Sequence, residues 1–237
     1  LKLDFGNSYR TGKPVFDDIF MRLPVSIKVA FLGMLLATVM GLPLGVLSAV
    51  KQYSPADSFL RVASTVLVAM PTFWLAMLLI LVFALYLGWL PAGGALTWQS
   101  YILPTITVGV PYGSKVLRMT RSTMLEEIRQ DYVRTARSKG VPEKKVIYGH
   151  ALKNALLPVI TTIGSAFGAI LGGSVIADSV FNLPGLGSLI VLSIKAKDTP
   201  SVLASVLLLA VFFAIIMLIV DLVYAFIDPR IKAKYAK

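Results

Sequence analysis

Few side chains in this sequence could carry out acid–base, metal or phosphate chemistry. The 237-residue chain has one histidine, His150, and no cysteine, and no Cys, Asp or Glu stands at metal-ligand spacing from that histidine. A structural hydrogen bond is therefore the favoured role for His150. The sequence also lacks the Gly-x-x-x-x-Gly-Lys-Ser/Thr loop that cradles nucleotide phosphates, so the chain cannot hydrolyse ATP by that chemistry. We expect no catalytic residue, no metal site and no cofactor bound by this chain.

One acid falls within a strongly apolar segment. Asp221 is surrounded in sequence by Leu, Ile, Val and Phe, and an ionisable side chain at membrane depth often marks a functional site. A contact with substrate and a pairing with a basic loop residue are both open, and the pairing is preferred. An ion- or proton-coupled carrier is the less favoured class of protein, because it needs several such acids and inverted repeats.

The composition is that of a membrane protein. Hydrophobic residues make up 57% of the chain and charged residues 15%, with a mean hydropathy of +0.79, whereas soluble domains are about 25% charged. A membrane span needs about 20 apolar residues. Hydropathy gives five candidate spans, at 25–50, 62–90, 101–119, 155–180 and 202–227. The expected fold class is therefore an all-α polytopic helical bundle.

Basic residues are concentrated in alternate loops. Residues 115–153 contain ten Lys or Arg and four Asp or Glu, the loop 51–61 and the tail after Asp228 are also basic, and residues 89–101 carry no charge. Because Lys and Arg accumulate on the cytoplasmic side of membranes, the C-terminus is expected in the cytoplasm. The net charge of +11 then reflects membrane topology, and nucleic-acid binding is not expected.

Five spans with a cytoplasmic C-terminus leave residue 1 on the opposite side of the membrane. No signal peptide is visible in the first residues, so a sixth span ahead of Leu1 is the simplest expectation. The expected organisation is an extracytoplasmic segment 1–23, a transmembrane domain 24–227 with a cytoplasmic loop at about 120–154, and a cytoplasmic tail 228–237.

Small residues recur along the first span. Gly33, Gly41 and Gly45 are separated by eight and four residues, which puts them on one face of a helix. Such a face favours close contact between two helices, and we assign it no other role.

The loop at about 120–154 has a helical pattern of its own. Apolar residues at spacings of three and four predict an amphipathic helix over Met124–Arg137, formed by Leu125, Ile128, Tyr132 and Ala136. Gly140 stands where a C-cap glycine would, and Pro142 suits the first turn of a second helix that runs to about Leu152, before Pro158 opens the next span. Since long ordered loops tend to be functional, we predict a helical hairpin that docks into another protein.

This loop resembles the "EAA" loop of ABC importer permeases. The general pattern places Glu-Ala-Ala three residues before a glycine; here Arg134, Thr135 and Ala136 precede Gly140, so the second alanine and the glycine match, and the closing proline is absent. However, "DYVRTARSKG" followed by "HALKNALLP" is typical of the dipeptide, oligopeptide and nickel permease subfamily. The stretches "RLPVSIKVA", "MPTFWLAMLL", "VFNLPGLGSLI" and "DLVYAFIDPRIK" agree with it, so the resemblance covers essentially the whole chain.

The resemblance implies two sets of site residues. In the family, the turn of the loop is a coupling helix that sits in a groove of the ATPase subunit. The corresponding contacts would be Thr135, Ala136, Ser138, Lys139, Gly140, Val141, Pro142 and Glu143. The family also has a short re-entrant element near the translocation path, and the candidate gate residues are Asp178, Asn182, Pro184 and Gly185. An ordinary tight loop is the alternative for these four residues.

The resemblance further implies a non-catalytic permease subunit of an ABC importer in a bacterial or archaeal plasma membrane. A second, homologous permease, two cytoplasmic ATPase subunits that bind ATP and Mg²⁺, and an extracytoplasmic solute-binding protein would complete the complex within the lipid bilayer. A heterodimer of permeases is expected. Di- or oligopeptides are the expected cargo, and nickel or a metal chelate is the alternative.

Overall fold

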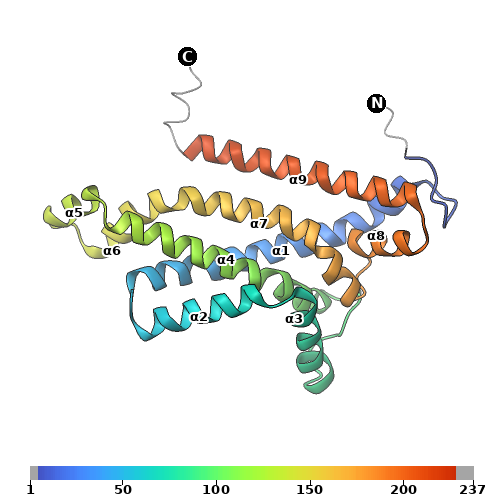
Figure 1. The fold of residues 1–237 in the computed structure, drawn as a ribbon, viewed down its shortest axis with the longest axis horizontal. Helices are drawn as coiled ribbons and strands as arrows, with labels where there is room; N and C mark the ends of the chain where they lie inside the picture. Colours follow the sequence, from blue (N-terminus) through green and yellow to red (C-terminus); the bar gives the residue numbers. More distant parts are fainter. Residues whose placement is uncertain (1–4, 228–237) are drawn as a thin grey trace, which may run out of the picture. The chain divides into compact units, whose positions relative to one another are not determined.

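The computed structural model describes residues 5–227, which fold into helices joined by turns (Figure 1). The α-helices are α1 (Val15–Val50), α2 (Pro55–Ala69), α3 (Thr72–Leu79), α4 (Ile102–Ile128), α5 (Asp131–Ser138), α6 (Glu143–Lys145), α7 (Leu152–Val180), α8 (Leu186–Lys195) and α9 (Thr199–Ile227). Two π-helical segments, η1 (Ile80–Tyr86) and η3 (Val146–Ala151), and a 3₁₀ turn, η2 (Trp98–Tyr101), complete the helical structure. The expected all-α fold is confirmed.

Three helices of the described chain are long and apolar enough to cross a membrane. They are α1, the continuous helix Glu143–Gly172 that contains most of α7, and Thr199–Val223 within α9. A fourth candidate is the broken pair formed by α2 with α3 and η1. The third expected span corresponds to α4, which has 27 residues but carries Lys115, Arg118 and Arg121 in its second half. These charges lower its apolar content, so that span stays a prediction.

Two expected spans differ from the structure at a proline. The second span is interrupted, because α2 ends at Ala69 and α3 begins at Thr72, with Pro71 in an extended conformation (φ −62°, ψ 134°). A proline disfavours helical geometry for the residue before it. By contrast, Pro158 does not open the fourth span, since it lies inside α7, which begins at Leu152.

The chain divides into two compact units. Unit 1 comprises the chain up to Leu36, Met70–Gly109 and Phe167–Ile216, and unit 2 comprises Ala37–Ala69, Val110–Ala166 and the chain from Met217 onward. One core cluster of unit 1 consists of Val15, Ile19 and Leu23 of α1, Leu186 and Leu189 of α8, and Ala204 of α9. The α1 members recur every four residues, so this buried stripe makes the chain helical before residue 24, where the transmembrane domain was expected to begin.

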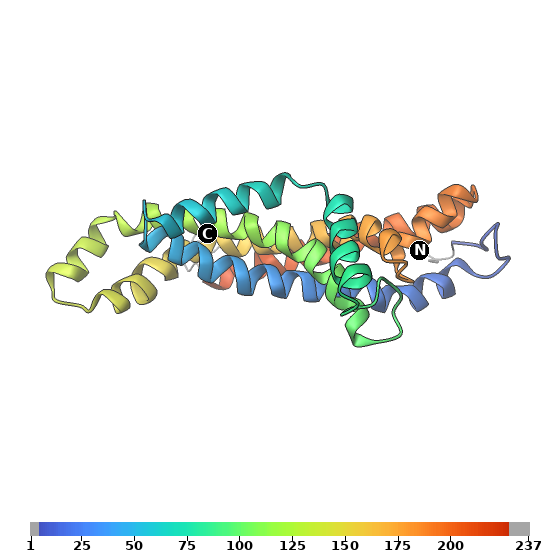
Figure 2. The same ribbon diagram turned by 90° about the horizontal axis from the view of Figure 1, so that it is seen from below.

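Within unit 2, α1 and α4 approach each other closely and run side by side (Figure 2). A Cβ atom built on Gly41 would lie 2.5 Å from the carbonyl oxygen of Gly113, and one built on Gly45 would lie 2.5 Å from Cβ of Thr120. In unit 1, Gly33 approaches α4 in a similar way. The packing face predicted from these three glycines is therefore confirmed.

Replacing Gly41 with alanine is expected to destabilise the protein by roughly 1–3 kcal/mol, because the added methyl group would overlap a backbone oxygen that cannot rotate away. Gly172→Ala in α7 is the matched control. Nothing lies within 4 Å of a Cβ atom at that position, and alanine favours a helix over glycine by about 1 kcal/mol. Thermal denaturation in detergent measures both variants. A Gly41→Ala variant as stable as the parent would contradict the close helix contact.

Candidate functional site

The predicted hairpin is present in unit 2, where α5 and α6 are joined by a tight turn (Figure 1). Gly140 adopts a left-handed φ of +76° just after α5. Its N–H donates to the carbonyl of Arg137 (2.9 Å), and the N–H of Val141 donates to the carbonyl of Ala136 (3.2 Å). These two bonds form a Schellman cap, the commonest glycine-dependent helix ending. The predicted C-cap role of Gly140 is confirmed.

The second helix of the hairpin begins one residue later than expected. Pro142 is extended (φ −56°, ψ 138°), and α6 starts at Glu143. From α5, Nε and Nη2 of Arg137 donate to the two carboxylate oxygens of Glu143 at 3.0 and 2.7 Å. This bidentate pair links the helices across the turn. Both side chains are partly exposed to solvent, so the pair contributes at most about 1 kcal/mol.

The first helix of the hairpin differs from the prediction. The single helix expected over Met124–Arg137 is wrong, because α4 ends at Ile128, Gln130 is extended (ψ 152°) and α5 starts anew at Asp131. The break changes which residues face inward. Val133 is fully buried, whereas Tyr132, which the apolar spacing had placed in the buried stripe, is exposed.

Tyr132 instead holds the break together. Its hydroxyl donates to Oε2 of Glu127 at 2.5 Å, from α5 back to the last turn of α4. Partial burial, together with this hydrogen bond to a carboxylate, raises the pKa of Tyr132 to about 12. The phenol therefore stays protonated and remains a hydrogen-bond donor throughout the physiological pH range.

A buried apolar cluster, which we call the hairpin core, lies beneath the turn. It contains Val46 and Ala49 at the end of α1, Met124 of α4, Val133 and Ala136 of α5, Val146, Ile147 and Ala151 of η3, and Ala155 of α7. Val141 packs against it. Of the eight residues predicted to contact an ATPase, Ala136 and Val141 thus face the hairpin core. The other six are exposed: Thr135, Ser138, Lys139, Gly140, Pro142 and Glu143.

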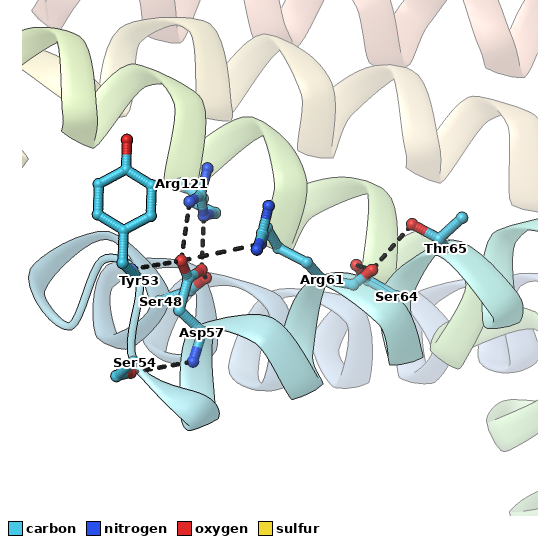
Figure 3. A network of polar contacts seen from close by, with 8 residues as sticks. All are labelled: Ser48, Tyr53, Ser54, Asp57, Arg61, Ser64, Thr65 and Arg121. Atoms are coloured by element: carbon cyan, nitrogen blue, oxygen red, sulfur yellow. Dashed lines mark hydrogen bonds and ion pairs between the residues drawn. The ribbon is translucent and has the colours of Figure 1, made fainter.

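A buried ion pair fixes the end of α1 that carries two members of the hairpin core. The Asp57 side chain is 0% exposed, and Nε and Nη2 of Arg121 donate to its two oxygens at 2.8 and 2.9 Å (Figure 3). The hydroxyl of Ser48 and the backbone N–H of Tyr53 add hydrogen bonds of 2.6 and 3.0 Å. Arg61 lies 3.8 Å away. We call these five residues the Asp57 network.

The Asp57 network positions the hairpin through α1. Ser48 lies between Val46 and Ala49, so the helix turn bound by Asp57 is the same turn that packs against the hairpin core. Sequence reasoning missed this network. A local signal was present, since Ser54 and Asp57 have capping-box spacing around a proline, and Ser54 Oγ does accept a hydrogen bond from the N–H of Asp57 (3.2 Å).

A cavity of about 260 Å³ lies next to the hairpin in unit 2. It is bordered by the last turn of α1 and by α6 and η3. Its lining residues are Val46, Leu47, Val50, Glu143, Lys144, Ile147 and Tyr148. The lining thus includes one acid, Glu143, and one base, Lys144, and is otherwise mainly apolar.

In unit 1, the predicted gate residues surround the start of α8. Asp178 is fully buried, and its Oδ2 accepts hydrogen bonds from the N–H of Gly187 (3.0 Å) and from the hydroxyl of Ser26 (3.3 Å). The Ser26 hydroxyl in turn accepts from the N–H of Leu186 (2.8 Å). Side chains of α7 and α1 therefore cap α8, because Gly185 at the N-cap has no side chain to do so.

The structure brings together two of the four predicted gate residues. A Cβ atom on Gly185 would overlap the carboxylate of Asp178, so only glycine fits beside that acid. Asn182 and Pro184 are exposed in the turn between α7 and α8, where Asn182 has a left-handed φ of +47°.

The two remaining titratable candidates join neither site. His150 is half-buried in η3, and no group of three or more His, Cys, Asp or Glu able to hold a metal occurs among residues 5–227. Asp221 is exposed on α9, and no described residue forms an ion pair with it. The tail 228–237, which holds further basic residues, lies outside the described residues.

Comparison with known proteins gives a family match over most of the chain. Residues 41–233 match the family described as "Binding-protein-dependent transport system inner membrane component". The chain is 41% identical over 231 residues to the glutathione transport system permease protein GsiC of Escherichia coli (strain K12), covering 98% of this chain and 76% of that protein. The protein of the same name from Salmonella typhimurium (strain LT2) is 41% identical over 234 residues, covering 99% and 76%.

Two solved structures are similar in fold. A chain of the MetNI methionine ABC transporter in an inward-facing conformation has a TM-score of 0.73 and 17% identity, covering 88% of this chain and 95% of that one. A chain of an amino acid ABC transporter crystallised with histidines has a TM-score of 0.64 and 15% identity, covering 91% and 94%. At these identities the likeness concerns the fold alone.

Proposed function

Because the chain belongs to the family of binding-protein-dependent transport system inner membrane components, we propose that it forms half of a pathway for di- or oligopeptides. As a family member it is a non-catalytic, membrane-spanning subunit of an ABC importer. One observation carries the peptide assignment: 41% identity over 98% of the chain to a permease named for glutathione, which is itself a tripeptide.

The contact with the ATPase is the α5–α6 hairpin. Four of the six exposed residues around the turn are small, namely Thr135, Ser138, Gly140 and Pro142, and they let a partner approach the backbone closely. The cavity of about 260 Å³ beside them has a mainly apolar lining and offers space for a partner side chain. Ala136 and Val141 support the turn from within the hairpin core.

The hairpin is built to pass on a displacement. The Schellman cap and the Arg137–Glu143 pair hold its turn, and the helix that begins at Glu143 is continuous with α7. A push on the turn therefore acts directly on a membrane-spanning helix. The energy comes from ATP, which the partner binds with Mg²⁺. A ligand shifts a conformational equilibrium only by its differential affinity for the two states, and here that ligand is ATP.

The complete importer contains a second, homologous permease, two cytoplasmic ATPases and an extracytoplasmic solute-binding protein. It lies in a bacterial or archaeal plasma membrane with the C-terminus of this chain in the cytoplasm. Asp178 and Gly185 hold the start of α8 as part of the gate, since the buried carboxylate ties that helix to both α7 and α1. Asn182 and Pro184, exposed in the adjoining turn, face the solute-binding protein.

Uptake by the reconstituted complex tests this function. The chain is assembled with its cognate partners in proteoliposomes, and entry of a radiolabelled dipeptide is measured with ATP, without ATP, and with nickel in place of peptide. We expect uptake of the dipeptide only with ATP and binding protein. Uptake that does not need ATP would contradict the assignment as an ABC importer. Uptake of nickel but not of the dipeptide would show that the cargo is the metal and not a peptide.

Charge reversal across the turn tests how the hairpin works. Arg137→Glu places two acids at the turn and is expected to lower ATP-driven uptake severalfold, while protein stability changes by less than about 1 kcal/mol because the pair is exposed. Adding Glu143→Arg restores an opposite-charge pair and should restore uptake. If the double variant transports no better than Arg137→Glu, the pair does not act by holding the turn.

A further inference from the structure

A cavity of about 430 Å³ lies in unit 1 between the first half of α1 and the start of α4. It is lined by Lys28, Leu32 and Leu36 of α1, by Trp98 and Tyr101 of η2, and by Ile102, Thr105 and Ile106 of α4. Its volume falls within the range of about 300–1,000 Å³ that is usual for small-molecule sites, and such sites combine apolar walls with a few polar groups. We call it the α1–α4 cavity.

The α1–α4 cavity contains one positive charge. Nζ of Lys28 lies 4.8 Å from the centroid of the Tyr101 ring, and no described carboxylate forms an ion pair with Lys28. A cation–π contact orients an ammonium group but leaves its full charge in place. Lys28 is also the only charged residue among the described residues that line the cavity.

A second polar group at the cavity lacks a partner. The hydroxyl oxygen of Thr105 is buried and has no hydrogen-bond partner among residues 5–227. Neighbouring Thr107 shows the usual alternative, because its hydroxyl donates to the carbonyl of Leu103 on the same helix (2.9 Å). An unpartnered buried hydroxyl is costly, which makes Thr105 a candidate for a bond to a ligand.

Lys28 is the fourth residue of the apolar run 25–50, and its side chain is exposed. A long basic side chain near the end of a span can extend its ammonium group to the membrane interface. A bound anion would pair with the charge there. The cavity walls are aliphatic and aromatic, so the anion must carry an apolar group.

We propose that the α1–α4 cavity is a subsite for the C-terminal residue of a peptide substrate, whose carboxylate pairs with Lys28 and accepts a hydrogen bond from Thr105. The apolar side chain of that residue packs against Trp98 and Tyr101. A single lysine matches the single charge of a carboxylate. This proposal rests on the proposed peptide importer function and adds the chemical group that the permease itself recognises.

Equilibrium binding tests the subsite without the solute-binding protein. The complex with its ATPase subunits is placed in nanodiscs of zwitterionic phospholipid, without ATP, and binding of radiolabelled leucyl-leucine is measured with competition by its C-terminal amide. In the parent protein, the free dipeptide should bind about tenfold or more tightly than the amide, the size expected for one hydrogen-bonded charge pair. Lys28→Gln should remove this preference, and Thr105→Val should reduce it.

Lys115→Gln is the matched control, because Nζ of Lys115 lies 4.6 Å from the Tyr112 ring in a second lysine–tyrosine contact, and neither residue lines the α1–α4 cavity. This variant should keep the full preference for the free dipeptide. Equal binding of dipeptide and amide to the parent would overturn the proposal, as would equal effects of Lys28→Gln and Lys115→Gln. The nanodisc lipid can also be changed to an anionic one. If the parent then loses dipeptide binding and Lys28→Gln does not respond to the change, the cavity binds a lipid headgroup and not a peptide.

Peptide uptake separates the subsite from the proposed function. If parent proteoliposomes take up leucyl-leucine and Lys28→Gln does so at an unchanged rate and half-saturating concentration, the subsite is wrong while the importer function stands. If the parent takes up no peptide, the function itself fails. The supporting result is uptake of leucyl-leucine by the parent, with a raised half-saturating concentration in Lys28→Gln.

Discussion

Replacing Gly140 with valine is expected to lower ATP-driven peptide uptake by about tenfold. No atom lies within 4 Å of a Cβ at this position, so the effect is not steric. It comes from the backbone: φ is +76°, a conformation that costs a residue with a Cβ roughly 1–2 kcal/mol and a β-branched one more. A cost of that size shifts the population of the native turn by a factor of about 5–30.

We expect Gly140→Val to lose the coupling between ATP hydrolysis and uptake. Without the left-handed residue, the hydrogen bonds from Gly140 and Val141 to the last turn of α5 cannot both form, and the exposed residues of the turn lose the positions that the proposed ATPase contact requires. Uptake and ATP hydrolysis are measured in the same proteoliposomes. We expect hydrolysis to continue while uptake falls, which distinguishes uncoupling from failed assembly.

Two control variants isolate the backbone effect. Gly140→Asn introduces a side chain that tolerates left-handed φ and should retain most of the uptake. Gly149→Ala adds a methyl group in η3, where the nearest atom to a built Cβ is a Lys145 side-chain carbon at 3.6 Å, and should behave like the parent. Normal uptake by Gly140→Val would contradict the role of the turn, and equal loss in Gly140→Asn would show that side-chain size matters instead.

Asp57→Asn is expected to destabilise the protein by about 3 kcal/mol, at the lower end of the range for removing one partner of a buried ion pair. The lower end applies because the Arg121 side chain remains 17% exposed and can reach solvent, whereas Asp57 is fully buried. For a chain of this size the loss corresponds to a fall in melting temperature of roughly 6–12 °C. Thermal denaturation of the purified protein in detergent measures it.

Matched variants separate the buried pair from charge in general. Asp131→Asn removes an acid whose partner Arg134 lies 3.9 Å away, with both side chains largely exposed, and should leave the melting temperature unchanged. The double variant Asp57→Leu, Arg121→Met replaces both charges with apolar groups and should recover part of the loss, because the Ser48 hydroxyl and the Tyr53 N–H still lose their acceptor. A single Asp57→Asn variant with the stability of the parent would contradict the network seen around that acid.

The two predictions concern one mechanical unit. Asp57 binds the turn of α1 that packs on the hairpin core, and Gly140 shapes the turn on the other side of that core. Destabilising Asp57 should therefore also weaken coupling at temperatures where the protein is still folded. Loss of stability with fully retained uptake would show that the end of α1 does not position the hairpin.

Local features of the chain were predictable because their causes are local. Long apolar runs mark helices that can enter a membrane, and the structure has helices over all five runs, although three pass as membrane spans alone and a fourth only as a broken pair. Gly140 ends α5 because a glycine after a charged amphipathic helix satisfies its last carbonyls at no steric cost. The spacing of Gly33, Gly41 and Gly45 similarly identified a packing face.

Local pattern failed where a short irregularity changed the helix phase. The apolar spacing continued through Gln130, so it predicted one helix and placed Tyr132 inward. The break at Gln130 instead turned Val133 toward the hairpin core, whereas Ala136 is buried there as the spacing predicted. Burial against residues from α1 and α7 is what makes that arrangement favourable, and a spacing count along one segment does not contain those partners.

The sequence by itself determined the class of protein, the apolar helices, the charged hairpin and its glycine turn, since each follows from composition or from residues within a few positions of one another. Tertiary structure alone decided which polar groups meet. Asp57 pairs with Arg121, 64 positions away, and Asp178 accepts a hydrogen bond from Ser26, 152 positions away. A buried polar group needs a partner, and the packing of the helices decides which polar group lies near enough to be that partner. The same packing placed Lys28, Tyr101 and Thr105 around one cavity, which no spacing along the chain indicates.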